Sequence, residues 1–183
     1  MRLQEPGILS PRQAVAQFRR WYREASRGEQ EASRLAAFVG DWAALEAAER
    51  ILREGAGGIS VHVSAVNRAL LQALPEAEAW AEKEKSPPGQ EEVRTVLQDT
   101  WKRWLQELPL TAEVEVLKHV ELVVAYRLDW AEVVRRTAFQ PILLLLPGGW
   151  EEGRGVTFPG FGHPWPLELL SEASTWMISD VSR

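Results

Sequence analysis

Short apolar runs alternate with amphipathic stretches along this chain, and the alternation limits the folds that it can form. Residues 35–39, 59–63 and 141–146 have the length and the apolar content of buried strands. Between them, apolar residues recur at the spacing of helices. Strands that alternate with helices are typical of a parallel sheet whose right-handed connections place helices on both faces. We therefore expect an α/β fold with three layers around a mostly parallel sheet.

Several residues mark where helices begin and end. Ser10 can cap a helix over residues 11–27, in which Pro11 suits the first turn. Asp41 precedes a second helix over 42–54, which the Gly-rich residues that follow bring to an end. We expect further helices at 64–74, 91–108, 129–137 and 166–177, one or two strands within 111–125, and an edge strand at 155–158.

Two segments rich in Pro and Gly interrupt these elements. Residues 76–90 are acidic and end near Pro-Pro-Gly, which favours a solvated loop or a mobile insertion. Residues 147–166 contain six Gly and four Pro; they either fold back over the edge of the sheet or present a partner-binding loop. The side chains that would make contacts there are Trp150, Phe158, Phe161, His163 and Trp165.

The composition is that of one globular protein. The chain has 183 residues, of which 45% are hydrophobic and 26% are charged. It has no Cys, which excludes disulfides, thiol nucleophiles and Cys-based zinc sites. No apolar run approaches the length that spans a membrane, and the N-terminus has no apolar leader. We therefore expect a cytoplasmic protein that contacts no membrane.

The net charge of −5 hides an uneven distribution. Residues 1–34 carry seven Arg and four acidic side chains, whereas residues 35–183 are acidic overall. We therefore divide the chain into a basic amphipathic N-terminal helix and an α/β domain over these two ranges. The arginines that fill the polar surface of the helix are Arg12, Arg19, Arg20, Arg23 and Arg27. This surface is either an ordinary solvated face or a contact for nucleic acid or for an acidic partner.

The first predicted strand ends at Gly40, directly before a helix, which is where an open α/β sheet can bind phosphate. The loop G-x-x-x-x-G-K-S/T does so with glycine amides, a Lys and a magnesium-binding hydroxyl. Here Leu45, Glu46 and Ala47 take the last three of those places. Lys118 follows the third core strand, where an ATPase would carry a metal-binding carboxylate. Either a nucleotide site has been lost or this turn never bound phosphate, so we expect no cofactor and no metal.

An enzymatic interpretation depends on four residues in and near the third core strand, Glu113, Glu115, His119 and Glu121. Strand alternation places the first two carboxylates on one face, which we expect to be solvated. His62 lies between two valines of a predicted strand, which favours a structural role. These residues do not assemble into a Ser/His/Asp triad or a carboxylate pair with any specificity. We therefore expect a chain that is not an enzyme, and keep an unrecognised enzyme that uses the four residues as an alternative.

The order of the parts carries a family resemblance over about residues 30–166. The matching segments are the strand that ends at Gly40, residues 59–63, 64–75 and 116–123, the apolar strand that ends in Pro147-Gly148, and residues 159–164. Together they resemble BrxF, a family of small P-loop proteins found in BREX bacteriophage-defence systems. The strand that ends in Pro-Gly also resembles BrxB, another small protein of these systems.

The resemblance implies a fold like that of P-loop NTPases, with degenerate nucleotide and metal positions at Gly40, Leu45, Glu46, Ala47 and Lys118. It further implies a non-catalytic adaptor or scaffold within a multi-protein assembly, whose partners are other proteins of the same defence system. A nucleic-acid-binding accessory protein that uses the N-terminal arginines on DNA or RNA is the alternative.

Overall fold

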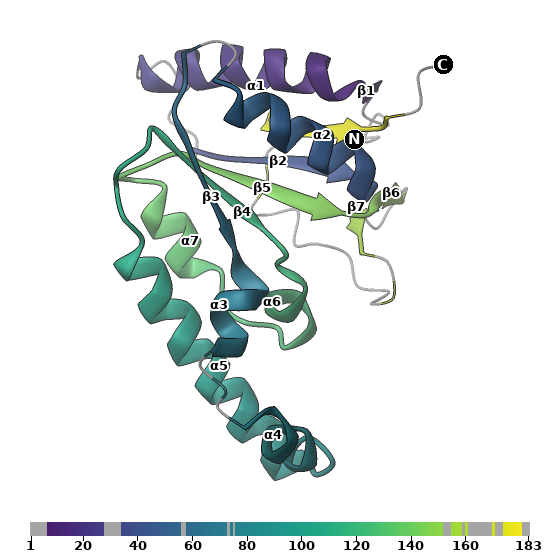
Figure 1. Ribbon diagram of the computed structural model, residues 1–183, viewed down its shortest axis with the longest axis vertical. Coiled ribbons are helices and arrows are strands. Elements are labelled where there is room, and N and C mark those ends of the chain that lie inside the picture. The colour runs from purple at the N-terminus through teal and green to yellow at the C-terminus, as the bar shows by residue number, and fades with distance from the viewer. Residues whose placement is uncertain are drawn as a thin grey trace.

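The computed structural model is built around one six-stranded sheet (Figure 1). It describes residues 7–27, 34–55, 58–72, 74, 76–151, 155–158, 160, 170 and 174–180. The strands of the sheet are β1 (Ile8–Leu9), β2 (Leu35–Gly40), β3 (Val61–Ala65), β4 (Val114–Lys118), β5 (Ile142–Pro147) and β8 (Thr175–Ile178). Their order is β1-β8-β2-β5-β4-β3, and every pairing in it is parallel.

Helices cover both faces of this sheet. One face carries α1 (Pro11–Ser26) and α2 (Trp42–Arg53), and the other carries α3 (Val66–Gln72), α5 (Pro87–Glu107), α6 (Glu121–Ala125) and α7 (Ala131–Arg136). The short helix α4 (Ala77–Lys83) lies beside the amino-terminal half of α5, away from the sheet (Figure 1). The predicted three-layer α/β architecture with a parallel sheet is therefore confirmed.

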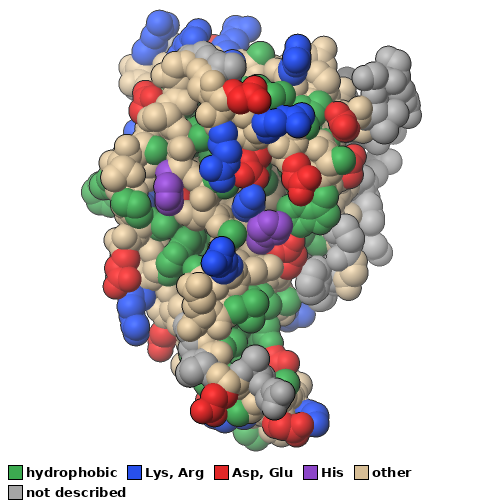
Figure 2. Space-filling view, in the orientation of Figure 1, with side chains coloured by type: hydrophobic (Ala, Val, Ile, Leu, Met, Phe, Trp, Pro, Cys, Tyr) green, Lys and Arg blue, Asp and Glu red, His purple; other side chains and the backbone are tan. Residues whose placement is uncertain are grey.

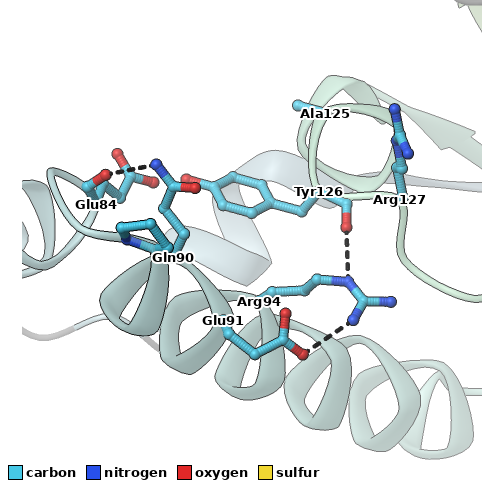
Figure 3. Close-up of a pocket in the computed structure, with 8 residues that line it drawn as sticks. Glu84, Gln90, Glu91, Arg94, Ala125, Tyr126 and Arg127 are labelled. Atoms are coloured by element: carbon cyan, nitrogen blue, oxygen red, sulfur yellow. Dashed lines mark hydrogen bonds and ion pairs between the residues drawn. The ribbon is translucent and has the colours of Figure 1, made fainter.

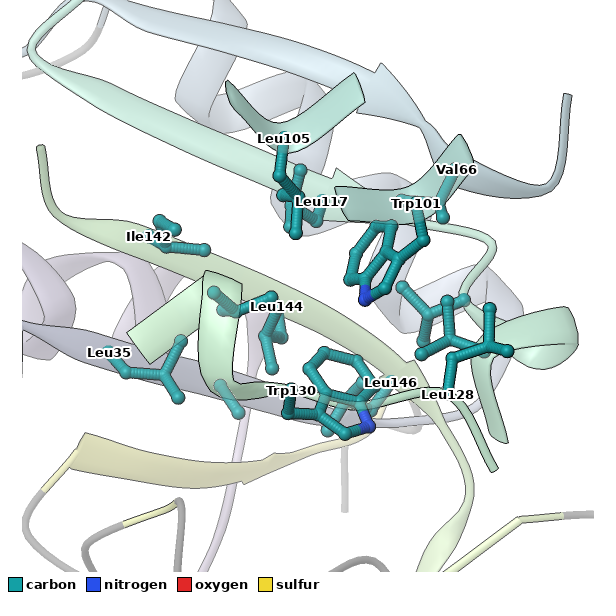
Figure 4. Packing of buried hydrophobic residues seen from close by; sticks show 14 of the residues in the cluster. Leu35, Val66, Trp101, Leu105, Leu117, Leu128, Trp130, Ile142, Leu144 and Leu146 are labelled. Atoms are coloured by element: carbon teal, nitrogen blue, oxygen red, sulfur yellow. The ribbon is translucent and has the colours of Figure 1, made fainter. Parts of the chain in front are cut away.

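The core on the α5 face is centred on tryptophan and leucine side chains (Figure 4). Trp101 of α5 is fully buried, and its indole Nε1 donates a hydrogen bond to the Asp129 carbonyl at 2.9 Å. Trp130 meets the same ring edge-on, with ring centroids 5.7 Å apart. The two central strands β2 and β5 are buried along their whole length, as expected of strands covered on both faces.

Aromatic side chains hold α1 against the other face. Phe18 and Trp21 of α1 pack with Phe38 of β2 and Trp176 of β8, with ring centroids 5.7 to 6.4 Å apart. The cap at Ser10 forms as predicted, because its hydroxyl accepts from the Gln13 amide. The basic helix is thus one of the layers around the sheet.

The prediction of a loop at residues 76–90 is wrong, because most of this segment is helical. It contains α4 and the start of α5. Pro87 and Pro88 occupy the first turn of α5, where a missing amide costs nothing, and the Ser86 hydroxyl caps that turn. A Cβ on Gly89 would lie 1.9 Å from the Lys83 carbonyl oxygen, so this glycine lets α4 and α5 touch.

Other element boundaries also differ from the prediction. Only one strand, β4, lies within 111–125, and α6 follows it. The predicted edge strand is β7 (Gly155–Thr157), which pairs antiparallel with β6 (Gly149–Glu151) outside the main sheet. The last predicted helix is wrong over its final residues, since Thr175–Ile178 is strand β8, buried between β1 and β2; residues 166–169 and 171–173 lie outside the described residues.

Candidate functional site

The carboxyl ends of β2, β5 and β4 lie at the edge where open parallel sheets bind ligands. β2 ends at Gly40, and α2 begins at Trp42. Asp41 lies between them, and its Oδ1 accepts a hydrogen bond from the Ala44 amide at 2.8 Å. A carboxylate therefore occupies the amino end of α2, the position at which a P-loop protein holds phosphate. Its negative charge stabilises the helix and opposes an incoming phosphate.

Gly40 has a packing role at this strand end. A Cβ on this residue would lie 2.2 Å from the carbonyl oxygen of Ile178 in the neighbouring strand β8. Gly40 is also paired with Pro147 of β5 on its other side. The close approach of β8 therefore accounts for the glycine without any phosphate.

Of the other degenerate positions, Glu46 and Lys118 line one hollow between α2 and the end of β4, whereas Leu45 is turned into the core. Leu45 is buried in the core, Glu46 is exposed, and Ala47 is half-buried. Lys118, at the carboxyl end of β4, donates from Nζ to Glu49 Oε2 of α2 at 2.8 Å. Lys118 thus neutralises a carboxylate of this chain.

The carboxylate of Glu49 accepts hydrogen bonds from two cationic side chains. Its Oε1 also accepts from Arg53 Nε at 2.9 Å. Burial acts to raise the pKa of Glu49, but the hydrogen bonds and charges of Lys118 and Arg53 outweigh it and lower that pKa. These three side chains form an ion-pair network that fastens α2 to β4, and sequence analysis missed it because Glu49 and Lys118 are far apart in the chain.

His119 and Glu121 are fixed in the turn between β4 and α6. His119 has a positive φ of 55° and its ring lies 4.8 Å from that of Trp42. Asn67, the only Asn of the chain, bridges the turn. Its amide nitrogen donates to Glu121 Oε2 at 2.7 Å, and its Oδ1 accepts from the Leu122 amide. The backbone amide of Asn67 also donates to the His119 carbonyl at 2.8 Å, so this one residue of α3 bonds both ends of the turn.

Glu115 is buried, so the prediction that it lies on a solvated face is wrong. Its carboxylate has no exposed surface and is held from strand β3. Ser64 Oγ donates to Oε1 at 2.6 Å, and His62 Nδ1 lies 2.9 Å from Oε2. Burial raises the pKa of Glu115 and outweighs these two hydrogen bonds, which act to lower it. His62 lies within a strand, as predicted.

Glu113 lies just before β4 and has a different environment. It accepts from the Ser60 amide at 2.7 Å and from the Tyr22 hydroxyl of α1 at 3.2 Å. The hydrogen bond from the Ser60 backbone is the main cause of the lowered pKa of Glu113. Glu113, Glu115, His119 and Glu121 therefore do not converge in one pocket, and no group of three or more potential metal-binding residues occurs in the part of the chain that the structure describes.

Three arginines of α1 and its C-cap residue Arg27 form a stripe along the polar side of the helix. Arg12, Arg19, Arg23 and Arg27 are separated by seven, four and four residues, a spacing that keeps side chains on one side of a helix. Basic side chains gather along the top of the face in Figure 2, over α1. Burial, and then the charge of Arg23, lower the pKa of Arg19.

Ion pairing leaves most of this arginine stripe unneutralised. Arg20, beside the stripe, pairs with Glu24 at 3.0 Å. Among the described residues, no carboxylate forms an ion pair with the four arginines of the stripe.

The Pro/Gly-rich segment 147–166 is described only in part. Phe158 is 3% exposed and belongs to the core on the α5 face, so it is not an exposed partner contact. A Cβ on Gly148 would lie 2.1 Å from the Thr157 carbonyl oxygen, which explains one of the glycines. The side chain of Trp150, and residues Phe161, His163 and Trp165, lie outside what the structure describes.

A cavity of about 670 Å³ lies between α5 and the turn after α6 (Figure 3). Arg94 joins its two sides, because its Nε donates to the Tyr126 carbonyl at 3.2 Å and its Nη1 pairs with Glu91 at 3.1 Å. The volume is in the range of small-molecule sites, but much of the lining is charged or amide side chains. Sequence analysis missed this hollow because the helical hairpin that forms one wall was expected to be a loop.

None of the protein-family models, curated proteins or solved structures compared with this chain matches it. No helix in the described part of the chain combines the length and the apolar character needed to cross a membrane.

Proposed function

We propose that this chain is a non-catalytic adaptor, an α/β domain of P-loop type that binds no nucleotide and acts by holding other proteins in an assembly. The observation that carries the proposal is Asp41. Its carboxylate is bonded to the amino end of α2 at the place where a P-loop would hold phosphate. Glu46 stands where the loop lysine would neutralise phosphate, and Lys118 is already paired with Glu49.

The order of the strands supports the P-loop part of the proposal. β5 lies between β2 and β4, so the phosphate and metal positions of such a protein would fall on either side of one strand. The resemblance of the segments to BrxF supports the proposal that this assembly acts in bacteriophage defence. The partners are then the proteins encoded beside this chain.

Nucleotide titration tests the first half of this proposal. We expect no saturable change in thermal unfolding or in calorimetric heat when ATP and Mg²⁺ are added up to millimolar concentration. A ligand at 100 times its dissociation constant would add about 2.7 kcal/mol to stability, which such an assay detects easily. An active P-loop ATPase measured in the same buffer is the control. Saturable ATP binding together with hydrolysis would overturn the proposal.

Co-expression tests the second half. The tagged chain is expressed with each protein encoded beside it, and complexes are isolated at two salt concentrations. We expect at least one neighbour to remain bound in stoichiometric amount. If every protein encoded beside this chain elutes separately from it, the adaptor function is refuted for this assembly. That conclusion holds even if the chain binds no nucleotide.

Nucleic-acid binding is a second candidate, favoured by the unneutralised arginine stripe on α1. Contacts from these side chains to phosphates predict an affinity that falls steeply with salt. Labelled DNA and RNA duplexes and single strands are titrated with the protein and with the variant R19E/R23E. The matched control K102E/R103E makes the same charge change at exposed positions of α5. Equal binding by all three proteins rejects this candidate.

A further inference from the structure

The two edges of the sheet differ in how they are protected. β1 is two residues long and pairs with β8, so that edge offers little backbone to another chain. β3 is five residues long and pairs only with β4 among the described strands. Four of its five residues are half-buried, and it contains no Lys, Arg, Asp, Glu or Pro that would hinder pairing with another strand. Within the part of the chain that the structure describes, the β3 edge is therefore open to strand addition.

The register fixes which backbone groups of β3 are free. The Ser60 carbonyl accepts from the Val114 amide of β4 at 3.2 Å, so the backbone of Ser60 points toward β4. Backbone groups alternate in direction along a strand. Those of His62 and Ser64 therefore also point toward β4, and those of Val61, Val63 and Ala65 point to the open edge.

We propose that this edge is an interface with a second copy of the chain, in which β3 pairs antiparallel with the same strand across a two-fold axis at Val63. This is the alignment in which all five residues of each strand are paired. Val63 lies opposite Val63 of the second copy, and Val61 lies opposite Ala65 at both ends. All of these are outward-pointing residues, so each facing pair exchanges two backbone hydrogen bonds.

The side chains of β3 are self-complementary in the same alignment. Val61 and Val63 pack against the core on the α2 side, so the second copy adds apolar side chains next to apolar ones. His62 and Ser64 lie on the opposite side of the strand, where His62 of one copy faces Ser64 of the other. No like charges face each other in this pairing, since the strand carries no Lys, Arg, Asp or Glu. A two-fold axis also satisfies the rule that most soluble homo-oligomers are closed dimers.

Cross-linking at the axis tests the proposal without disturbing the fold. The chain has no Cys, so Val63→Cys introduces a single thiol of similar size at the centre of the interface. In a hydrogen-bonded antiparallel pair the two Cα atoms are about 5.5 Å apart, within the range of a disulfide. Under mild oxidation by oxidised glutathione we expect a covalent species of twice the 20.7 kDa chain mass. Arg103→Cys on exposed α5 is the control and should cross-link at least tenfold more slowly.

Charge exchange at the same position tests the register. Val63→Lys and Val63→Glu each place like charges opposite one another, so each variant alone should be a monomer by sedimentation velocity, whereas the wild type and Val63→Thr should be dimers. An equimolar mixture of the two charged variants should restore the dimer. Circular dichroism and tryptophan fluorescence establish that each variant is folded.

The proposal is overturned if the wild type stays monomeric across micromolar concentrations and Val63→Cys cross-links no faster than the control. It is also overturned if the wild type is a dimer that the two charged variants retain. These outcomes do not depend on nucleotide binding or on the neighbouring proteins.

Discussion

The buried carboxylate of Glu115 makes the stability of this protein depend on pH. The sign of this dependence is opposite to that produced by most acidic residues. Glu115 has no exposed surface and faces Ser64 and His62 across the β3–β4 pairing. Burial raises its pKa above the ordinary value of 4.5. The folded state therefore keeps a proton at pH values where the unfolded state has lost it.

The sign of the effect follows from this difference in proton binding. The stabilising contribution of protonated Glu115 is fully present below pH 4.5 and is lost as pH rises from that value through the pKa of the folded state. Within that window the loss reaches at most about 1.4 kcal/mol per pH unit for one proton. Glu115→Gln cannot ionise, while its amide oxygen still accepts from Ser64. The variant should therefore gain stability relative to the wild type as pH rises.

Urea unfolding followed by tryptophan fluorescence between pH 4.5 and 7.5 measures this difference. Glu113→Gln is the matched control, because the lowered pKa of Glu113 places its effect below pH 4.5 and gives it the opposite sign. His62→Gln removes the imidazole that faces this carboxyl group and serves as a second control. A difference between wild type and Glu115→Gln that is flat over this range, or that favours the wild type at higher pH, would refute the reasoning.

Four other substitutions probe contacts that the structure explains. Gly40→Ala drives a methyl group into the β8 carbonyl and should cost about 1–3 kcal/mol in urea unfolding. Gly89→Ala forces α4 away from α5 and should accelerate hydrogen exchange in α4 more than in the sheet. Asp41→Ala removes the cap of α2 and should cost about 1 kcal/mol, with no gain of ATP binding in a calorimetric titration. Trp101→Phe leaves a carbonyl without its indole donor and should lower the urea midpoint by the equivalent of about 1–3 kcal/mol.

The elements that sequence predicts well are those whose ends and burial are local properties. Ser10 and Asp41 cap α1 and α2 as expected, because a cap is set by a few neighbouring residues. The uninterrupted apolar residues of β5 mark a strand covered on both faces. The layered architecture follows from the order of such elements and from the handedness of their connections.

The errors arise where distant parts of the chain decide the outcome. The alternation of β4 is correct, but which of its faces is covered depends on α5 and α7, so the sequence predicts a solvated Glu115 although this residue is buried. The four residues Thr175–Ile178 are too few to show a strand periodicity in the sequence. They form a strand because they pair with β1 and β2. The bridge from Asn67 to Glu121 joins residues far apart in sequence and has no local signal.

The place of β2 at the middle of the sheet affects how the chain can fold during synthesis. Its two neighbours, β5 and β8, both come from the last quarter of the sequence. Until these segments leave the ribosome, the most apolar early strand has no partner on either side, and α1 and α2 lack the part of their packing surface that β5 and β8 supply. Such distant pairing makes folding slow. It also leaves apolar surface exposed on the partly folded chain, which favours aggregation. A nascent chain of this protein should therefore engage chaperones that hold apolar segments until its final strands arrive.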